Sequence, residues 1–400
     1  MLSALQIFAL KIRSFAVRAD SCRPFRVISC FSWAKKLQDR STQRSPSLRE
    51  DQQGPSWFSL HPLRPSPLCV KKIPFLLVVL FGVLSLQAQT PPAKEPSYQS
   101  GQVVDGVIYY KQFVNFGPGK DSWINFALRF PPGHKDGDPV RGVLCVCTWK
   151  DTPDGVMGNL RSGPLVKWAQ KNEFALLSWS RLKFYTIGTS NDEMDDKENR
   201  EWDRQFDIAA RKWEYSIGEL TRKYKLPAKG FLIDGISGGA QTAHRLALRK
   251  PEYFAGIHIH INSSYDDLTP GAKNMAWLVT TGEREFGYTA SHRFYYNALE
   301  LGYPMIYKAG EGLGHSGSPE IDKLTVAFFD YLLPFLPDYR DKDPQAKGDP
   351  YKLMRQPRYI GDWLNQQAVP FEKRHLIQGR YQTALPTRDI AVAWGPLLER

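Results

Sequence analysis

Short apolar runs alternate with amphipathic stretches from residue 102 to residue 336. Runs of this kind, bounded by Gly, Pro and charged residues, are typical of buried strands. The candidate strands are 102–110, 123–130, 142–148, 174–179, 230–234, 255–261, 275–281 and 304–308. Strands separated by helices predict an α/β domain over 102–336, with a mostly parallel central sheet of about eight strands and helices on both faces.

The helical stretches carry apolar residues three and four positions apart, which indicates one buried face per helix. The two clearest stripes are Phe206, Ala210, Trp213, Ile217 and Leu220, and Ile321, Leu324, Phe328 and Leu332. A further helix is expected from about Ala240 to Lys250, because Pro251 cannot continue it. The polar stretch 181–204 has no period and predicts a surface excursion. Prolines punctuate 337–400, which predicts a tail packed on the domain with a short helix near 389–393.

Positive charge is concentrated at the start of the chain. The formal net charge is +12, and residues 1–88 contribute +9 of it, so the remainder of the chain implies no nucleic-acid partner. Lys71 and Lys72 precede an apolar run over 73–84, and a small residue, Ala88, follows. This pattern predicts a signal peptide over 70–88, a spacer over 89–101, and a secreted or periplasmic protein with no stable membrane anchor after cleavage.

A signal peptide normally starts a chain, whereas here 69 residues precede it. We predict that Val70 is the true start, read from an alternative initiation codon, and that 1–69 is an extension produced by an incorrectly assigned start. A transit peptide and an uncleaved membrane anchor are the alternatives.

Cys145 and Cys147 lie two apart on one strand, so both face one side and are expected to be small buried residues, not a disulfide or a metal site.

The strongest chemical motif is Gly235-Ile236-Ser237-Gly238-Gly239, between an apolar strand and a helix. In this context a G-x-S-x-G sequence forms a sharp turn that exposes the serine hydroxyl, and its small residues allow the helix to start against the strand. Ser237 is therefore the candidate nucleophile. The Gly238 backbone N–H and one from the loop at Thr148 or Trp149 are the candidate oxyanion donors.

A serine nucleophile needs a base, and His315 in a glycine-rich loop after strand 304–308 fits best. His258 and His260 alternate with isoleucines on one strand, which favours buried partnered residues over a metal pair. His244 follows the serine on its helix, and His292 is expected on a helix surface.

The third residue, which orients the imidazole, is less determined by the sequence. Glu285, in the loop after strand 275–281, is the first choice because it precedes His315 and lies at the expected sheet edge. Asp266 and Asp267, which follow the preceding strand, and Glu283 remain alternatives.

The Gly235–Gly239 motif, the Gly282 loop and Gly314-His315, in this order, resemble the α/β-hydrolase superfamily over about residues 100–335. Within it, the chain is similar to secreted esterases of the polyhydroxybutyrate depolymerase and feruloyl or acetylxylan esterase type. The resemblance implies acyl transfer to water through an acyl-serine intermediate.

The expected function is a secreted serine hydrolase that cleaves a small-molecule or polysaccharide-linked carboxylic ester, with no metal or organic cofactor. A serine peptidase on the same fold and a non-catalytic binding protein are the alternatives. Aromatic residues near the predicted site would suit a sugar or an aromatic acyl group, although such residues more often serve packing. They are Trp149, Trp179, Tyr185, Phe286 and Tyr288.

Overall fold

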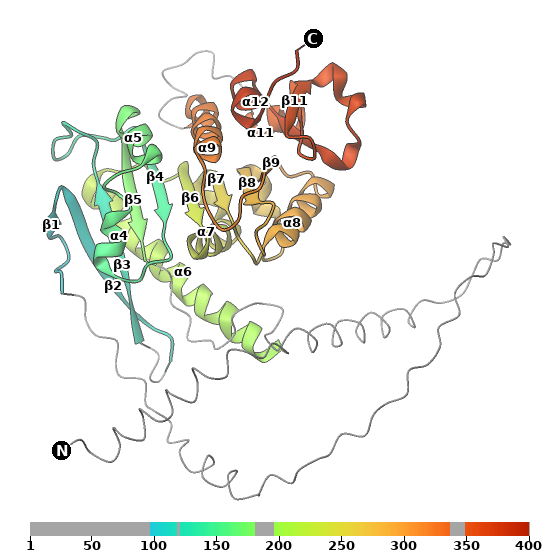
Figure 1. The fold of residues 1–400 in the computed structure, drawn as a ribbon. Helices are drawn as coiled ribbons and strands as arrows, with labels where there is room; N and C mark the ends of the chain where they lie inside the picture. The colour runs from blue at the N-terminus through green and yellow to red at the C-terminus, as the bar shows by residue number, and fades with distance from the viewer. Residues whose placement is uncertain (1–96, 118–120, 181–195, 337–348, 400) are drawn as a thin grey trace, which may run out of the picture. The chain divides into compact units, whose positions relative to one another are not determined.

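The computed structural model describes residues 97–117, 121–180, 196–336 and 349–399 (Figure 1). The predicted extension 1–69, the signal peptide 70–88 and most of the spacer 89–101 lie outside these ranges. Within the ranges, no helix combines the length and the hydropathy needed to cross a membrane.

A mostly parallel sheet of nine strands forms the centre of the described chain, in the order β1-β2-β3-β5-β4-β6-β7-β8-β9. Strands β1, β2, β3 and β5 pair antiparallel, and every pairing from β5 to β9 is parallel. The strands are β1 (Val103–Val104), β2 (Val107–Asn115), β3 (Asp121–Arg129), β4 (Gly142–Cys147), β5 (Phe174–Trp179), β6 (Phe231–Ile236), β7 (Phe254–His260), β8 (Ala276–Gly282) and β9 (Met305–Gly310).

Helices cover both faces of this sheet (Figure 1). One face carries α5 (Pro164–Lys171) and α9 (Pro319–Leu332), and the other carries α6 (Asp196–Tyr224), α7 (Gly238–Arg249) and α8 (Tyr288–Glu300). Helix α4 (Pro153–Gly158) packs near β3. Short 3₁₀ turns occur at η1 (Pro251–Tyr253), η2 (Pro270–Asn274), η3 (Leu333–Phe335), η4 (Phe371–Leu376) and η5 (Gly379–Tyr381).

The predicted strands and helical stripes are confirmed, with local differences. All nine residues of the two stripes are buried, which places α6 and α9 against the sheet. The run 102–110 divides into β1 and the start of β2, which continues to Asn115. The predicted surface excursion 181–204 is wrong over 196–204, which form the first turns of α6, and 181–195 lie outside the described residues. Cys145 and Cys147 are buried and free, and burial raises the pKa of both thiols.

The C-terminal segment contacts the outer strand of the sheet. It contains α11 (Pro350–Arg355), a three-stranded sheet in the order β11-β10-β12, and α12 (Arg388–Trp394), which includes the predicted helix near 389–393. The sequence analysis did not predict its strands β10 (Tyr359–Asp362), β11 (Gln367–Pro370) and β12 (Gln382–Leu385).

Two hydrogen bonds fix this segment to the backbone of β9. The Tyr307 N–H donates to Thr383 Oγ1 at 2.9 Å, and Trp394 Nε1 donates to the Tyr307 carbonyl at 2.9 Å. Beside them, the ammonium group of buried Lys308 donates to Gln366 Oε1 at 3.0 Å and to the carbonyl of Trp394.

Candidate active site

Ser237 lies in the tight turn between β6 and α7. Its backbone has φ +55° and ψ −124°, a left-handed conformation that non-glycine residues rarely adopt and that costs about 1–3 kcal/mol. The Ser237 N–H donates to the His260 carbonyl at 3.0 Å, which holds the turn against β7. The strained turn presents the hydroxyl at the carboxyl end of the strands, beside the free N–H groups of a helix N-terminus.

The flanking glycines are required by close backbone contacts. A Cβ on Gly235 would lie 2.7 Å from the Gly239 carbonyl oxygen, and a Cβ on Gly239 would lie 2.3 Å from the Cys147 carbonyl oxygen. Real Cβ atoms are not found at such separations from a backbone oxygen, so each position accepts only glycine without a backbone shift. The motif therefore packs the start of α7 directly on the ends of β6 and β4.

His315 joins the serine to a buried carboxylate. Its Nε2 lies 2.9 Å from Ser237 Oγ, and its Nδ1 lies 3.0 Å from Glu285 Oε2. The Glu285 side chain is 1% exposed, whereas that of His315 is 45% exposed. A carboxylate only accepts, so Nδ1–H donates to Glu285 and Nε2 is left with a lone pair for the serine proton. The structure thus brings together the three residues that the sequence analysis ranked first.

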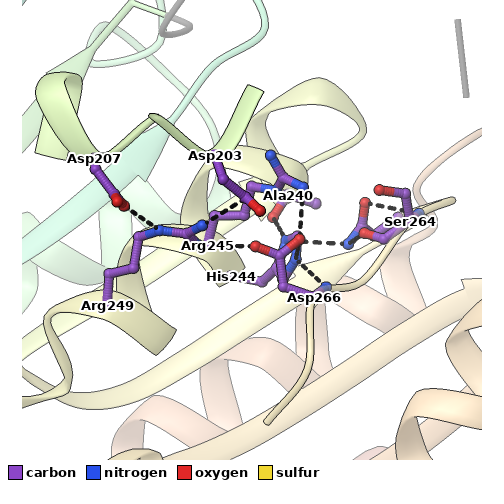
Figure 2. Close-up of polar contacts among 9 residues, drawn as sticks. Asp203, Asp207, Ala240, His244, Arg245, Arg249, Ser264 and Asp266 are labelled. Atoms are coloured by element: carbon purple, nitrogen blue, oxygen red, sulfur yellow. Dashed lines mark hydrogen bonds and ion pairs between the residues drawn. The ribbon is translucent and has the colours of Figure 1, made fainter. Parts of the chain in front are cut away.

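The other candidate acids have different partners. Asp266 lies in a cluster with two arginines from α7 (Figure 2), accepting from Arg245 at 2.6 Å and from Arg249 at 2.8 Å. Asp267 is exposed, and Glu283 accepts from the Gly312 N–H at 3.0 Å.

Charge balance in the cluster of Figure 2 fixes the ionisation of its members. Burial raises the pKa of Asp266, but His244, Arg245 and Arg249 more than offset this, so its pKa lies below the usual range. Burial lowers the pKa of His244 to about 4, so this ring is neutral near pH 7. Its Nε2 accepts from the Asp266 N–H at 3.1 Å, which leaves Nδ1–H to donate to the Ala240 carbonyl at 3.2 Å. His244 therefore anchors a loop and has no lone pair free for the serine.

The predicted oxyanion donors lie around the same turn. Gly238 is the first residue of α7, where backbone N–H groups have no partner within the helix. The close approach of Gly239 to Cys147 and Thr148 brings the loop after β4 beside the turn. Trp149 follows in that loop and is 60% exposed. The oxyanion role of Gly238 and Trp149 stays a prediction.

The other three histidines considered in the sequence analysis, His258, His260 and His292, are packed side chains. His258 and His260 are buried and hydrogen bonded on one face of β7, as the alternation with isoleucine predicts. Across the described ranges, no group of three or more His, Cys, Asp or Glu is arranged to hold a metal ion. The surface position expected for His292 is wrong, because its half-buried ring packs against Trp363 of the C-terminal segment, with ring centroids 4.5 Å apart.

The aromatic residues near the site divide into two groups. Phe286 stacks on the His315 ring, with centroids 5.8 Å apart and 9° between the planes, and it is 77% exposed. Trp149 is exposed as well. Trp179, in contrast, is fully buried in the core, and Tyr185 lies outside the described residues. Tyr288, the fifth of these aromatic residues, is half-buried and stacks on His292, with ring centroids 5.9 Å apart. Among the four that the structure describes, Phe286 and Trp149 are exposed.

The sheet order, the strained serine turn and the Ser–Glu–His arrangement in chain order define the α/β-hydrolase fold. No protein-family model and no curated protein sequence matches the chain.

Solved structures similar to this chain include esterases and a peptidase. A thermostable esterase is 14% identical over 52% of this chain and 55% of its own, with a TM-score of 0.37. A putative dipeptidyl aminopeptidase IV from Bacteroides ovatus is 12% identical over 57% of this chain and 36% of its own, with a TM-score of 0.41. A ferulic acid esterase is 14% identical over 58% of this chain and 97% of its own, with a TM-score of 0.40. The chain thus spans about half or less of the length of the first two proteins.

Proposed function

We propose that this protein is a serine hydrolase that cleaves carboxylic esters through an acyl-serine intermediate. The observation that supports it most is the 2.9 Å contact between Ser237 Oγ and His315 Nε2, with Glu285 on the other ring nitrogen. A hydroxyl, a base and a carboxylate in this order are the parts that serine acyl transfer requires.

The proposed reaction has two halves. Ser237 Oγ attacks the ester carbonyl carbon while its proton passes to His315 Nε2, and the resulting oxyanion accepts from the backbone N–H groups of Gly238 and Trp149. The tetrahedral intermediate then expels the alkoxide, which takes the proton from His315.

In the second half, His315 removes a proton from water, and the hydroxide attacks the acyl-serine. Collapse releases the carboxylic acid and returns the proton to Ser237, while Glu285 stabilises the imidazolium in both halves.

The substrate class and the location are proposed from the sequence. We propose a small-molecule or polysaccharide-linked ester as the substrate and no metal, organic cofactor or nucleic acid as a partner. The signal peptide proposed for 70–88 would direct the mature chain to a secreted or periplasmic location. Detection of the mature N-terminus near residue 89 by peptide mass spectrometry would support this. Detection of residues 1–69 in the expressed protein would contradict the proposed start at Val70.

Labelling of the full chain by a fluorophosphonate probe tests the nucleophile. We expect covalent labelling of the native protein, its loss in Ser237→Ala, and its retention in the control Ser216→Ala, whose hydroxyl donates to a carbonyl within α6 at 3.0 Å. Labelling that persists unchanged in Ser237→Ala would overturn the proposal. A protein that is never labelled would instead be a binding protein that retains the fold.

The bond that is cleaved is tested separately, because a serine peptidase uses the same three residues. We expect the purified protein to hydrolyse p-nitrophenyl acetate faster than aminoacyl nitroanilides. Release of the anilides alone would exclude an esterase.

A further inference from the structure

A row of buried polar side chains crosses three strands below the candidate active site. Asp234 Oδ1 lies 2.6 Å from His258 Nδ1, and His258 Nε2 lies 2.8 Å from Thr280 Oγ1. Thr280 Oγ1 lies 2.8 Å from His260 Nδ1, and His260 Nε2 lies 3.2 Å from the Ser316 carbonyl. The four residues are at most 4% exposed. This polar chain, as we call it, ends beside the catalytic candidate histidine, because Ser316 follows it directly.

Hydrogen-bond direction along the polar chain is determined from its last member. The Ser316 carbonyl only accepts, so His260 Nε2 must carry a proton. Burial, and after it the neighbouring His258, lowers the pKa of His260 to about 4, so the ring is neutral near pH 7 and Nδ1 has a lone pair. Thr280 therefore donates its single proton to His260 Nδ1. The same hydroxyl oxygen lies 2.8 Å from His258 Nε2.

His258 is fixed at its other ring nitrogen. Its Nδ1 faces Asp234, whose carboxylate oxygens only accept. A second acceptor faces the same nitrogen from α9: Thr325 Oγ1 lies 3.3 Å from Nδ1 and donates its own proton to the Ile321 carbonyl at 2.8 Å. Both neighbours of Nδ1 thus require a donor there.

His260 also connects the two halves of the active site. Its carbonyl accepts from the Ser237 N–H at 3.0 Å, while its ring donates to the carbonyl beside His315. One residue thus contacts both the serine turn and the histidine loop, the first through its backbone and the second through its side chain. Removing the ring breaks only the second connection.

We propose that His260 is a positioning residue whose ring, protonated at Nε2, fixes the His315 loop through Ser316. The kinetic consequence rests on the proposed hydrolase function, whereas the tautomer of His260 does not. A ring with a fixed donor at Nε2 holds the loop carbonyl at one distance from β7, which keeps His315 Nε2 within reach of Ser237 Oγ.

The tautomer of His260 is tested by nitrogen-15 NMR of the full chain with labelled histidine rings. At pH 8, above the ordinary histidine pKa of about 6.5, we expect this ring to be protonated at Nε2 alone. Its signal should be lost in His260→Gln and should persist in the inactive Ser237→Ala. A His260 ring protonated at Nδ1 alone would overturn the assignment whether or not the protein is an esterase.

Positioning is tested by the kinetics of two His260 variants. In His260→Leu, which has no donor, we expect kcat for ester hydrolysis to fall at least tenfold with KM changed less than twofold. In His260→Gln, which carries an amide N–H close to the place of Nε2, we expect most of kcat to return. Equal losses in both variants, or a change in KM alone, would overturn the positioning role. If His260→Leu fails to fold, Thr280→Val supplies the test, because its hydroxyl fixes His260 Nδ1, and an unchanged kcat there would contradict the proposal.

Discussion

Ser237 and His315 are separated by 78 positions in the chain, and their Oγ and Nε2 atoms lie 2.9 Å apart. The parallel pairing of β6 through β9 explains this, because the turn after β6 and the loop after β9 then emerge at the same edge of the sheet. Glu285, in the loop after β8, reaches the same place from between them.

Replacing Glu285 by Gln should slow the chemical step. The neutral amide cannot stabilise an imidazolium, and its NH₂ group favours the wrong His315 tautomer, so we expect kcat to fall on the order of 10³-fold with little change in KM. Steady-state kinetics measures both, and circular dichroism checks that the variant folds. A loss of less than tenfold would remove Glu285 from the mechanism.

Replacing Asp266 by Asn should affect stability more than turnover. The change leaves the guanidiniums of Arg245 and Arg249 without their shared carboxylate, and the Arg245 side chain is only 6% exposed. We therefore expect a loss of about 3 kcal/mol in the free energy of unfolding. Urea denaturation measures it, and the exposed neighbour Asp267→Asn is the control.

The pH dependence of the Asp266 effect has a defined sign. Its pKa is lowered in the folded state, so its stabilisation is present above the unfolded pKa of about 3.9 and is lost as the pH falls through the lower folded value. The difference between Asp266→Asn and the native protein should therefore shrink in acid. A kcat loss in Asp266→Asn that exceeds the loss in Glu285→Gln would contradict the assignment of both residues.

These two acids show how far the sequence determines the site. Glu285 and Asp266 both follow a parallel strand, so strand order places each at the correct edge and cannot choose between them. The choice depends on Arg245 and Arg249, which bind Asp266 from α7, and a single sequence does not reveal which carboxylate these side chains meet. Hydrophobic periodicity likewise predicted α6 from Phe206 onward, but not over 196–204, where charged residues dominate the sequence.

The polar chain illustrates the same limit. Alternation with isoleucine predicted that His258 and His260 share one face of a strand. Their connection through Thr280 depends on the register of β7 against β8, which pairs His260 with Thr280. Local sequence carries no information on that register, so the partners became visible only in the structure.

Adding a methyl group at Gly239 should disrupt the serine turn. In Gly239→Ala the Cβ would lie 2.3 Å from the Cys147 carbonyl oxygen, so the backbone must shift. We therefore expect the free energy of unfolding to fall by more than about 2 kcal/mol and the activity to be lost. The control is Gly218→Ala in α6, where no atom lies within 4 Å of the new Cβ. Helix propensity predicts that this control gains about 0.5–1 kcal/mol, and equal thermal stability of the two variants would refute the packing argument.

Lys308 should give the protein a stability that rises with pH. Burial lowers its pKa to about 8 from the ordinary value of 10.5, so the unfolded chain binds more protons between these values. The unfolding free energy should rise by on the order of 3 kcal/mol from pH 8 to pH 10.5, as measured by urea denaturation. Lys308→Met should flatten this slope, and an identical slope in the variant would show that another group is responsible.

Phe286 is expected to contribute to the binding of ring-shaped acyl groups. Its exposed ring is nearly parallel to the His315 ring. Stacking of one aromatic pair contributes about 1 kcal/mol of binding free energy. Phe286→Ala should therefore raise KM about fivefold for methyl cinnamate and less for methyl hexanoate. The control is Leu376→Ala, an exposed apolar residue of the C-terminal segment. Equal changes for the two esters would argue against a stacking role.

The two hydrogen bonds at Tyr307 have a consequence for association between molecules. As the last strand of its sheet, β9 would otherwise present free amides and carbonyls to any extended peptide, including β9 of another copy. The Thr383 hydroxyl and the Trp394 indole occupy those groups with side chains, and no further strand can be added at that point. The C-terminal segment thereby protects the sheet margin from aggregation through strand addition.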